Sequence, residues 1–76
     1  MFYYFSMVKV LFSERLKSLR EEKGISREQL ANVLNVSIRL ISYWENAQRE
    51  CTFEMLIILA DYFSCSIDYL LGRIDY

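Results

Sequence analysis

Hydrophobic residues recur at helical spacing along most of the chain, and short polar stretches separate the runs. Between residues 26 and 46 two such stripes follow each other closely: Leu30, Ala31 and Leu34 in the first, Ile41 and Trp44 in the second. Spacings of three and four residues place each set on one face of a helix. The pattern therefore predicts helices over residues 27–34 and 38–46, joined by a sharp corner.

Polar residues at the ends of these stretches are typical of helix termini. Ser26 and Ser37 precede the two helices, where a side-chain oxygen accepts a hydrogen bond from a free backbone N–H. Gln29 follows Ser26 at the spacing of a capping box. Asn35 stands where the first helix must end, and Asn adopts the left-handed conformation readily. Two helices with so short a connection predict a helix-turn-helix.

The chain before this pair predicts one extended segment and one helix. Residues 2–12 are aromatic and β-branched with a single charge, a composition that favours an extended segment. A lone strand needs a partner, so the segment either pairs with its copy in another subunit or packs over the core. The helix is expected from Ser13 to Lys23, with Ser13 as its N-cap and Gly24 after its end.

Two further helices are expected after the pair. Thr52 precedes a strongly apolar helix with an inward set of Phe53, Leu56, Ile57, Leu59, Ala60 and Phe63. A last short helix, begun by Ser64 or Ser66, has its inward residues at Ile67, Leu70 and Leu71. Five helices with short connections predict a compact all-α domain over residues 12–72. An N-terminal segment, 1–11, precedes it and a tail, 73–76, follows.

Composition narrows the class of protein. The 76 residues suffice for one domain, and 54% hydrophobic with 25% charged residues is ordinary for a folded protein. No apolar run is long enough to span a bilayer, and the N-terminus lacks the basic start and cleavage site of a signal peptide. Cys51 and Cys65 are expected to be reduced, buried thiols in the cytoplasm. Without His, a zinc site is not expected, and neither is a cofactor.

Charge is divided unevenly along the chain, whose net charge is −1. Residues 1–49 hold eight basic and five acidic residues, a net charge of +3, whereas residues 50–76 have a net charge of −4. The predicted helix-turn-helix therefore lies in the basic half. Attraction to phosphate depends on the local patch more than on the total charge.

Four motifs occur in order along the chain: RLKSLREEKG at 15–24, ISREQLA at 25–31, VSIRLISYWEN at 36–46 and DYLLG at 68–72. With these spacings, residues 12–72 resemble the Cro/cI-type (Xre-like, phage-repressor) helix-turn-helix family. The resemblance implies a five-helix lambda-repressor-like fold whose second and third helices form the helix-turn-helix. Three positions depart from the family pattern: Asn35 replaces Gly, Cys51 replaces Pro, and Leu40 replaces a small hydroxyl residue.

The resemblance also implies roles for individual residues. Residues 38–46 become the recognition helix in the major groove, with base readout by Ile38, Arg39 and Tyr43. The guanidinium of Arg39 suits guanine O6 and N7. Implied phosphate contacts are Arg27, Gln29, Ser42, Asn46 and Arg49. Arg20 and Glu45 are expected to form a structural ion pair.

Two hypotheses of function follow. The first is sequence-specific binding of double-stranded DNA by a small transcriptional regulator, a repressor acting as a homodimer on a palindromic operator. Its candidate interfaces are the last helix and the aromatic N-terminus. The alternative is a protein-interaction module on the same fold, such as an antirepressor or antitoxin-like partner, which the acidic balance and Leu40 favour. An enzyme is not expected, since the chain lacks His and a glycine-rich phosphate loop. Neither membrane nor small-molecule binding is expected.

Overall fold

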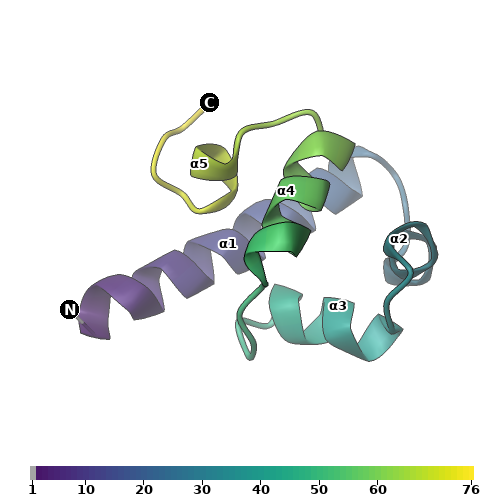
Figure 1. Ribbon diagram of the computed structural model, residues 1–76, viewed down its shortest axis with the longest axis horizontal. Helices are drawn as coiled ribbons and strands as arrows, with labels where there is room; N and C mark the ends of the chain where they lie inside the picture. Colours follow the sequence, from purple (N-terminus) through teal and green to yellow (C-terminus); the bar gives the residue numbers. More distant parts are fainter. Residues whose placement is uncertain (1) are drawn as a thin grey trace.

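The computed structural model describes the backbone of residues 2–76 and the side chains of residues 7–76. Within this part of the chain the helices are α1 (Phe2–Glu22), α2 (Arg27–Leu34), α3 (Ile38–Glu45), α4 (Phe53–Tyr62) and α5 (Ile67–Leu70), and there is no strand. α2 and α3 meet at a corner, and α4 crosses in front of α1 (Figure 1). The predicted all-α, five-helix fold is confirmed.

Each helix contributes one fully buried side chain to the core: Leu16, Leu30, Ile41, Leu59 and Leu70, in chain order. Burial of one Leu or Ile side chain contributes roughly 1.5–3 kcal/mol. Phe12, Ala31 and Trp44 are buried beside them. Since all five helices pack on one cluster, the angle between α2 and α3 is set by the whole domain and not by the corner alone.

The N-terminal segment differs from the prediction. Residues 2–11 are the first turns of α1, not an extended segment, and Met1 lies outside the described residues. Strand propensity reflects packing on a sheet, whereas a helix satisfies its backbone groups by itself. Val8 and Leu11 lie on the side of α1 that carries Phe12, so the helical stripe of the first helix begins earlier than expected. None of the described helices is long and apolar enough to cross a membrane.

Ser13 is correspondingly not an N-cap. It lies inside α1, where its buried hydroxyl donates to the carbonyl of Val10 at 2.7 Å. The other predicted caps are present: the side chains of Ser26, Ser37, Thr52 and Ser66 each accept from the backbone N–H three residues later. Local rules therefore hold at the starts of α2, α3, α4 and α5.

All five helices end in the same way. A left-handed residue lies one or two positions after the last helical residue, and paired backbone bonds of the Schellman type close the last turn, at Gly24, Asn35, Ala47, Ser64 and Gly72. Asn35, with φ 57° and ψ 46°, confirms the predicted end of α2. Ala47 and Ser64 adopt the left-handed backbone conformation although it costs an L-residue about 1–2 kcal/mol.

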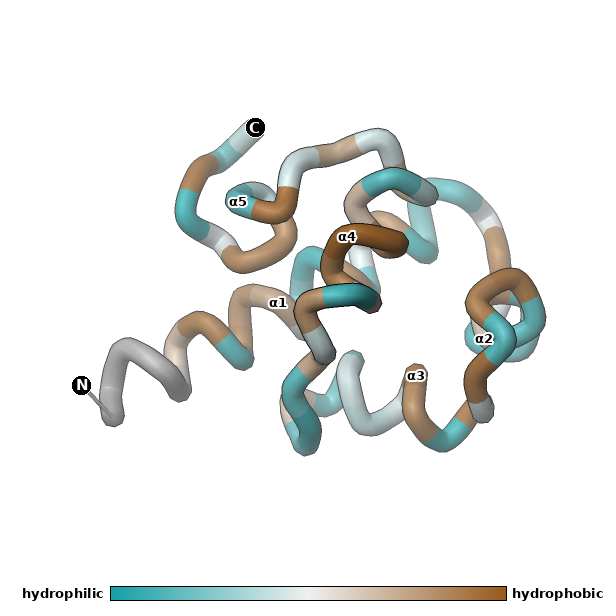
Figure 2. The backbone as a smooth tube through the Cα atoms, in the orientation of Figure 1, coloured by the Kyte–Doolittle hydropathy of each residue, from teal (hydrophilic) through white to brown (hydrophobic). Residues whose placement is uncertain are grey.

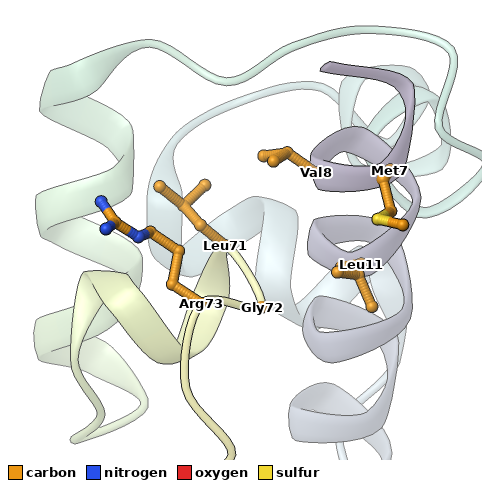
Figure 3. Close-up of a pocket in the computed structure, with 6 residues that line it drawn as sticks. All are labelled: Met7, Val8, Leu11, Leu71, Gly72 and Arg73. Atoms are coloured by element: carbon orange, nitrogen blue, oxygen red, sulfur yellow. The ribbon is translucent and has the colours of Figure 1, made fainter. Parts of the chain in front are cut away.

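The end of α5 packs closely against α1. A Cβ atom on Gly72 would lie 2.6 Å from the Cβ of Leu11, so only glycine fits between the two segments. A hollow of about 250 Å³ lies next to this contact, lined by Met7, Val8, Leu11, Leu71, Gly72 and Arg73 (Figure 3). The close approach explains why the left-handed position here is a glycine and not another residue.

Most of the predicted inward set of α4 packs on the core, but two of its residues face outward. Leu56, Leu59 and Ala60 are buried as predicted, but Phe53 is 85% exposed and Ile57 is 52% exposed. The helix is hydrophobic around most of its circumference, as the brown tube of Figure 2 indicates. A pattern with so few polar positions does not select one inward face, so packing against the other helices selects it.

Candidate nucleic-acid interface

The recognition helix predicted from the sequence, α3, has two distinct faces. At 100° per residue, five positions fall within an arc of about 140°. These are Ile38, Arg39, Ser42, Tyr43 and Asn46, and all five are exposed or only partly buried. The side chains on the opposite side pack into the core. The structure therefore brings all predicted base-readout residues onto one accessible face.

The opposite face of α3 anchors it to the rest of the domain. Ile41 and Trp44 are buried, and Leu40 packs against the core from its edge. Leu40, which replaces a small hydroxyl residue of the family pattern, is thus a packing residue and not part of the exposed arc. Because rigid elements hold a site more accurately than loops do, this anchoring orients the side chains of the arc.

Tyr43 and Arg49 lie together at the end of the arc. The Arg49 guanidinium carbon is 5.1 Å from the centre of the Tyr43 ring, a cation–π distance. Asn46, the C-cap of α3, is exposed beside them. Stacking limits the motion of the long Arg49 side chain, so a residue outside the helix is held next to it.

Glu45, at the end of α3 beside the buried Trp44, is the centre of a buried ion-pair network. Its side chain has no exposed surface. One carboxylate oxygen accepts from Arg20 Nε at 2.7 Å, and the other accepts from Arg20 at 3.2 Å and from Arg27 Nε at 3.1 Å. Arg20 also donates to the carbonyl of Ile25 at 2.8 Å. The bond to Glu45 raises the pKa of the Arg20 guanidinium. The network therefore joins α1, α2 and α3.

Arg27 was expected from the sequence only as a phosphate contact, and its bond to Glu45 was not foreseen. Its side chain is 37% exposed, so the far end of the guanidinium still faces solvent. The sequence indicates this bond only through the positions of the two residues: Arg27 is the first residue of α2, and Glu45 is the last residue of α3. Their contact requires the angle at which the two helices cross, which no local pattern contains.

The N-terminus of α2 has its predicted capping box. Ser26 N–H donates to Gln29 Oε1 at 2.7 Å, and Gln29 N–H donates to Ser26 Oγ at 3.0 Å. This arrangement fixes the Gln29 side chain through its oxygen and leaves its amide nitrogen as the group that faces outward. The N–H groups of Arg27 and Glu28, in the first helical turn, point toward the same end.

Arg15 of α1 contacts the C-terminal part of the chain. Its guanidinium stacks 4.2 Å from the ring centre of Tyr69 and donates to the carbonyl of Ile74 at 3.3 Å. It also pairs with the exposed Asp75 at 3.4 Å. Arg15 therefore fastens the C-terminal tail to α1 and takes no part in the exposed face of α3.

Comparison with known proteins gives related sequences for most of the chain. A family model described as helix-turn-helix matches residues 16–70. The HTH-type transcriptional activator BcrR of Enterococcus faecalis is 42% identical over 61 residues, 80% of this chain. Repressor protein C2 of Salmonella phage P22 is 36% identical over 61 residues, again 80% of this chain. The HTH-type transcriptional regulator ImmR of Bacillus subtilis is 32% identical over 60 residues, 79% of this chain.

These relatives are longer proteins. The aligned part is 30% of BcrR, 28% of the phage repressor and 47% of ImmR. The chain thus spans less than half the length of each. The aligned region nevertheless contains the whole of α2 and α3, with their caps and their buried anchors.

Proposed function

The chain belongs to the Cro/cI-type helix-turn-helix family, and from this premise we propose that it regulates transcription by binding double-stranded DNA in a sequence-specific manner. One observation carries the proposal. Five predicted contact residues share an accessible arc on α3, while the opposite face of that helix is fixed in the core. A helix exposed and anchored in this way suits the major groove.

Within the arc we assign base readout to Ile38, Arg39 and Tyr43. Arg39 is exposed near the N-terminus of α3, the end that enters the groove in this class of motif. Its guanidinium can donate to both O6 and N7 of one guanine, an interaction worth about 1–3 kcal/mol of discrimination. Ile38 offers an apolar surface to a thymine methyl group, and Tyr43 offers a hydroxyl to a base edge.

Phosphate contacts in this proposal come from both sides of α3. Arg27 and Gln29 lie at the start of α2, and Ser42, Asn46 and Arg49 lie along or just after α3. The bond of Arg27 to Glu45 and the stacking of Arg49 on Tyr43 support the assignment, because both restrict long side chains before DNA arrives. Such contacts set the register of the protein on DNA and carry no sequence information.

The proposed active species is a homodimer on a palindromic operator. One recognition helix reads only a few base pairs, whereas two related by a two-fold axis read half-sites about one helical turn apart. Repression is the proposed outcome of binding. Since the relatives named above include an activator and a repressor, a reporter assay with the operator placed before or over a promoter tests the direction of regulation.

The test starts from DNA selected in vitro from a random pool. In mobility-shift assays we expect Arg39→Ala to reduce the preference for the selected sequence over a single-base variant by roughly 5–150-fold. Arg49→Ala should weaken both sequences equally and lower the salt dependence of binding by about one phosphate contact. Arg73→Ala, which removes an exposed arginine of the tail, is the matched control.

Two results would refute the proposal. No shift with any DNA at low salt would exclude DNA binding and leave the protein-interaction module as the alternative. An unchanged sequence preference in Arg39→Ala would remove Arg39 from base readout.

A further inference from the structure

The least covered large apolar side chain of α4 lies beside a groove. Phe53 is the first residue of α4 and protrudes into solvent, and Ile57 follows it one turn later on the same side. The groove has a volume of about 190 Å³ and is lined by Val8, Lys9, Phe12, Glu50, Cys51, Phe53, Leu56 and Leu71. A protruding aromatic ring and an apolar hollow therefore share one face of the molecule.

The groove exists because α1 is longer than the core needs. Its N-terminal half extends past the body formed by α2, α3 and α4 (Figure 1). Val8 extends the apolar stripe of α1 one turn N-terminal to the buried Phe12, and the two residues form one wall of the groove. The connector at Glu50 and Cys51 forms the other wall. The apolar stripe of α1 thus extends past the buried core to Val8, which is only partly buried.

The two walls carry opposite charges. Lys9 stands on the α1 wall and Glu50 on the connector wall, and no ion pair joins them among the described side chains. Every other residue that lines the groove is apolar or a cysteine. The groove is therefore apolar at its base, positive along one edge and negative along the other.

We infer that this face binds a second copy of the chain, with Phe53 of each copy seated in the groove of the other. An isologous contact requires one surface to supply both halves of the fit, and this face carries a protrusion, a hollow and both signs of charge. A two-fold axis along the groove sets Lys9 of each copy opposite Glu50 of the other. A two-fold axis across the groove would set like charges together, so the charges select the first arrangement.

The last helix, one of the two interfaces considered from the sequence, offers much less apolar surface. Leu70 is fully buried in its own core, and Arg15 lies over the ring of Tyr69. The most exposed large apolar side chain of the described helices is instead Phe53 of α4, and such side chains favour association. We therefore place the interface where the monomer leaves large apolar side chains exposed.

This inference rests on the proposed homodimer and can fail separately from DNA binding. None of the residues that line the groove is among those assigned to bases or phosphates. A variant at the groove therefore leaves the DNA-contacting residues of each subunit unchanged, and binding to a single half-site remains measurable.

The first experiment compares two exposed apolar residues by sedimentation equilibrium over micromolar concentrations. Phe53→Ser removes the protrusion, and Val33→Ser removes a 55% exposed side chain of α2 outside the groove. We expect the dimer dissociation constant to rise at least roughly tenfold in Phe53→Ser and to stay unchanged in Val33→Ser. Circular dichroism should show both variants folded, since neither side chain is in the core.

The second experiment reverses the charges. Lys9→Glu alone and Glu50→Lys alone each place like charges across the two-fold axis, so each variant should be monomeric where the wild type is dimeric. An equimolar mixture of the two should form a heterodimer, because every facing pair is then opposite in sign. This rescue separates a reciprocal contact from general destabilisation of the fold.

Three outcomes would overturn the inference: a wild type that stays monomeric at 100-fold higher concentration, a Phe53→Ser variant that dimerises as well as Val33→Ser, or a mixture of charge variants no more dimeric than either alone. In each case half-site binding by the same proteins would show whether the proposed DNA-binding function still holds. Conversely, a folded Arg39→Ala variant that dimerises normally but no longer binds the half-site would show loss of DNA binding without loss of the dimer.

Discussion

The buried carboxylate of Glu45 should make its two arginine partners unequal in their effect on stability. Arg20 gives two hydrogen bonds to Glu45 and is only 11% exposed, whereas Arg27 gives one and is 37% exposed. The Glu45 side chain itself has no exposed surface. When Arg20 is replaced by Met, the carboxylate keeps a single partner in a place that water cannot reach.

Breaking a buried pair by removing one partner costs about 3–5 kcal/mol. Small domains have unfolding free energies of about 5–15 kcal/mol, so Arg20→Met removes a large part of the total. At 4–8 °C per kcal/mol for a domain of this size, the midpoint of thermal unfolding should fall by about 12 °C or more. Arg27→Met keeps both bonds from Arg20 to Glu45 and removes only the more exposed arginine, so it should cost about 1 kcal/mol or less.

Urea unfolding followed by circular dichroism gives these free energies directly. Arg39→Met, an exposed arginine on the same helix as Glu45, serves as the control and should change stability by less than about 0.5 kcal/mol. In the double variant Arg20→Met/Glu45→Leu, the loss should be smaller than the sum of the single losses, since no uncompensated charge remains. A cost for Arg20→Met no greater than that for Arg27→Met would refute this reasoning.

Three further predictions concern stability and thiol chemistry. Ala47→Gly should stabilise the protein by about 0.5–1 kcal/mol in urea unfolding, because Ala47 has φ 57° at the end of α3; an unchanged midpoint would contradict this. Gly72→Ala should cost about 2–4 kcal/mol through its left-handed φ and the contact with Leu11, whereas Gly24→Ala, where nothing lies nearby, should cost only about 1–2 kcal/mol from backbone strain. Burial raises the pKa of the Cys51 thiol from 9.0 to about 12, so at pH 9 its thiolate is about 500-fold scarcer than with an ordinary pKa. Alkylation of Cys51 in the folded protein, followed by mass spectrometry, should still accelerate above pH 10, but it should level off there in urea.

Features that depend on neighbours in the sequence were predictable in detail. The caps at Ser26 and Ser37 and the left-handed end at Asn35 each involve a bond between groups a few residues apart. The stripes of α2 and α3 are equally local, because a helix with clear polar positions has one possible inward face. The helix-turn-helix, its anchors and its exposed arc were therefore visible in the sequence, although the DNA roles within that arc remain proposals.

Only the tertiary structure settled features that depend on which surfaces other helices leave free. The aromatic start of the chain continues α1 because its backbone has no partner strand and a helix needs none. Phe53 and Ile57 face outward because α4 is apolar on nearly every side and packing selected the side that carries Leu56, Leu59 and Ala60. Arg27 meets Glu45 because α2 and α3 cross at an angle set by a core to which all five helices contribute. Contacts between distant residues have no local signature, so the sequence alone could not place them.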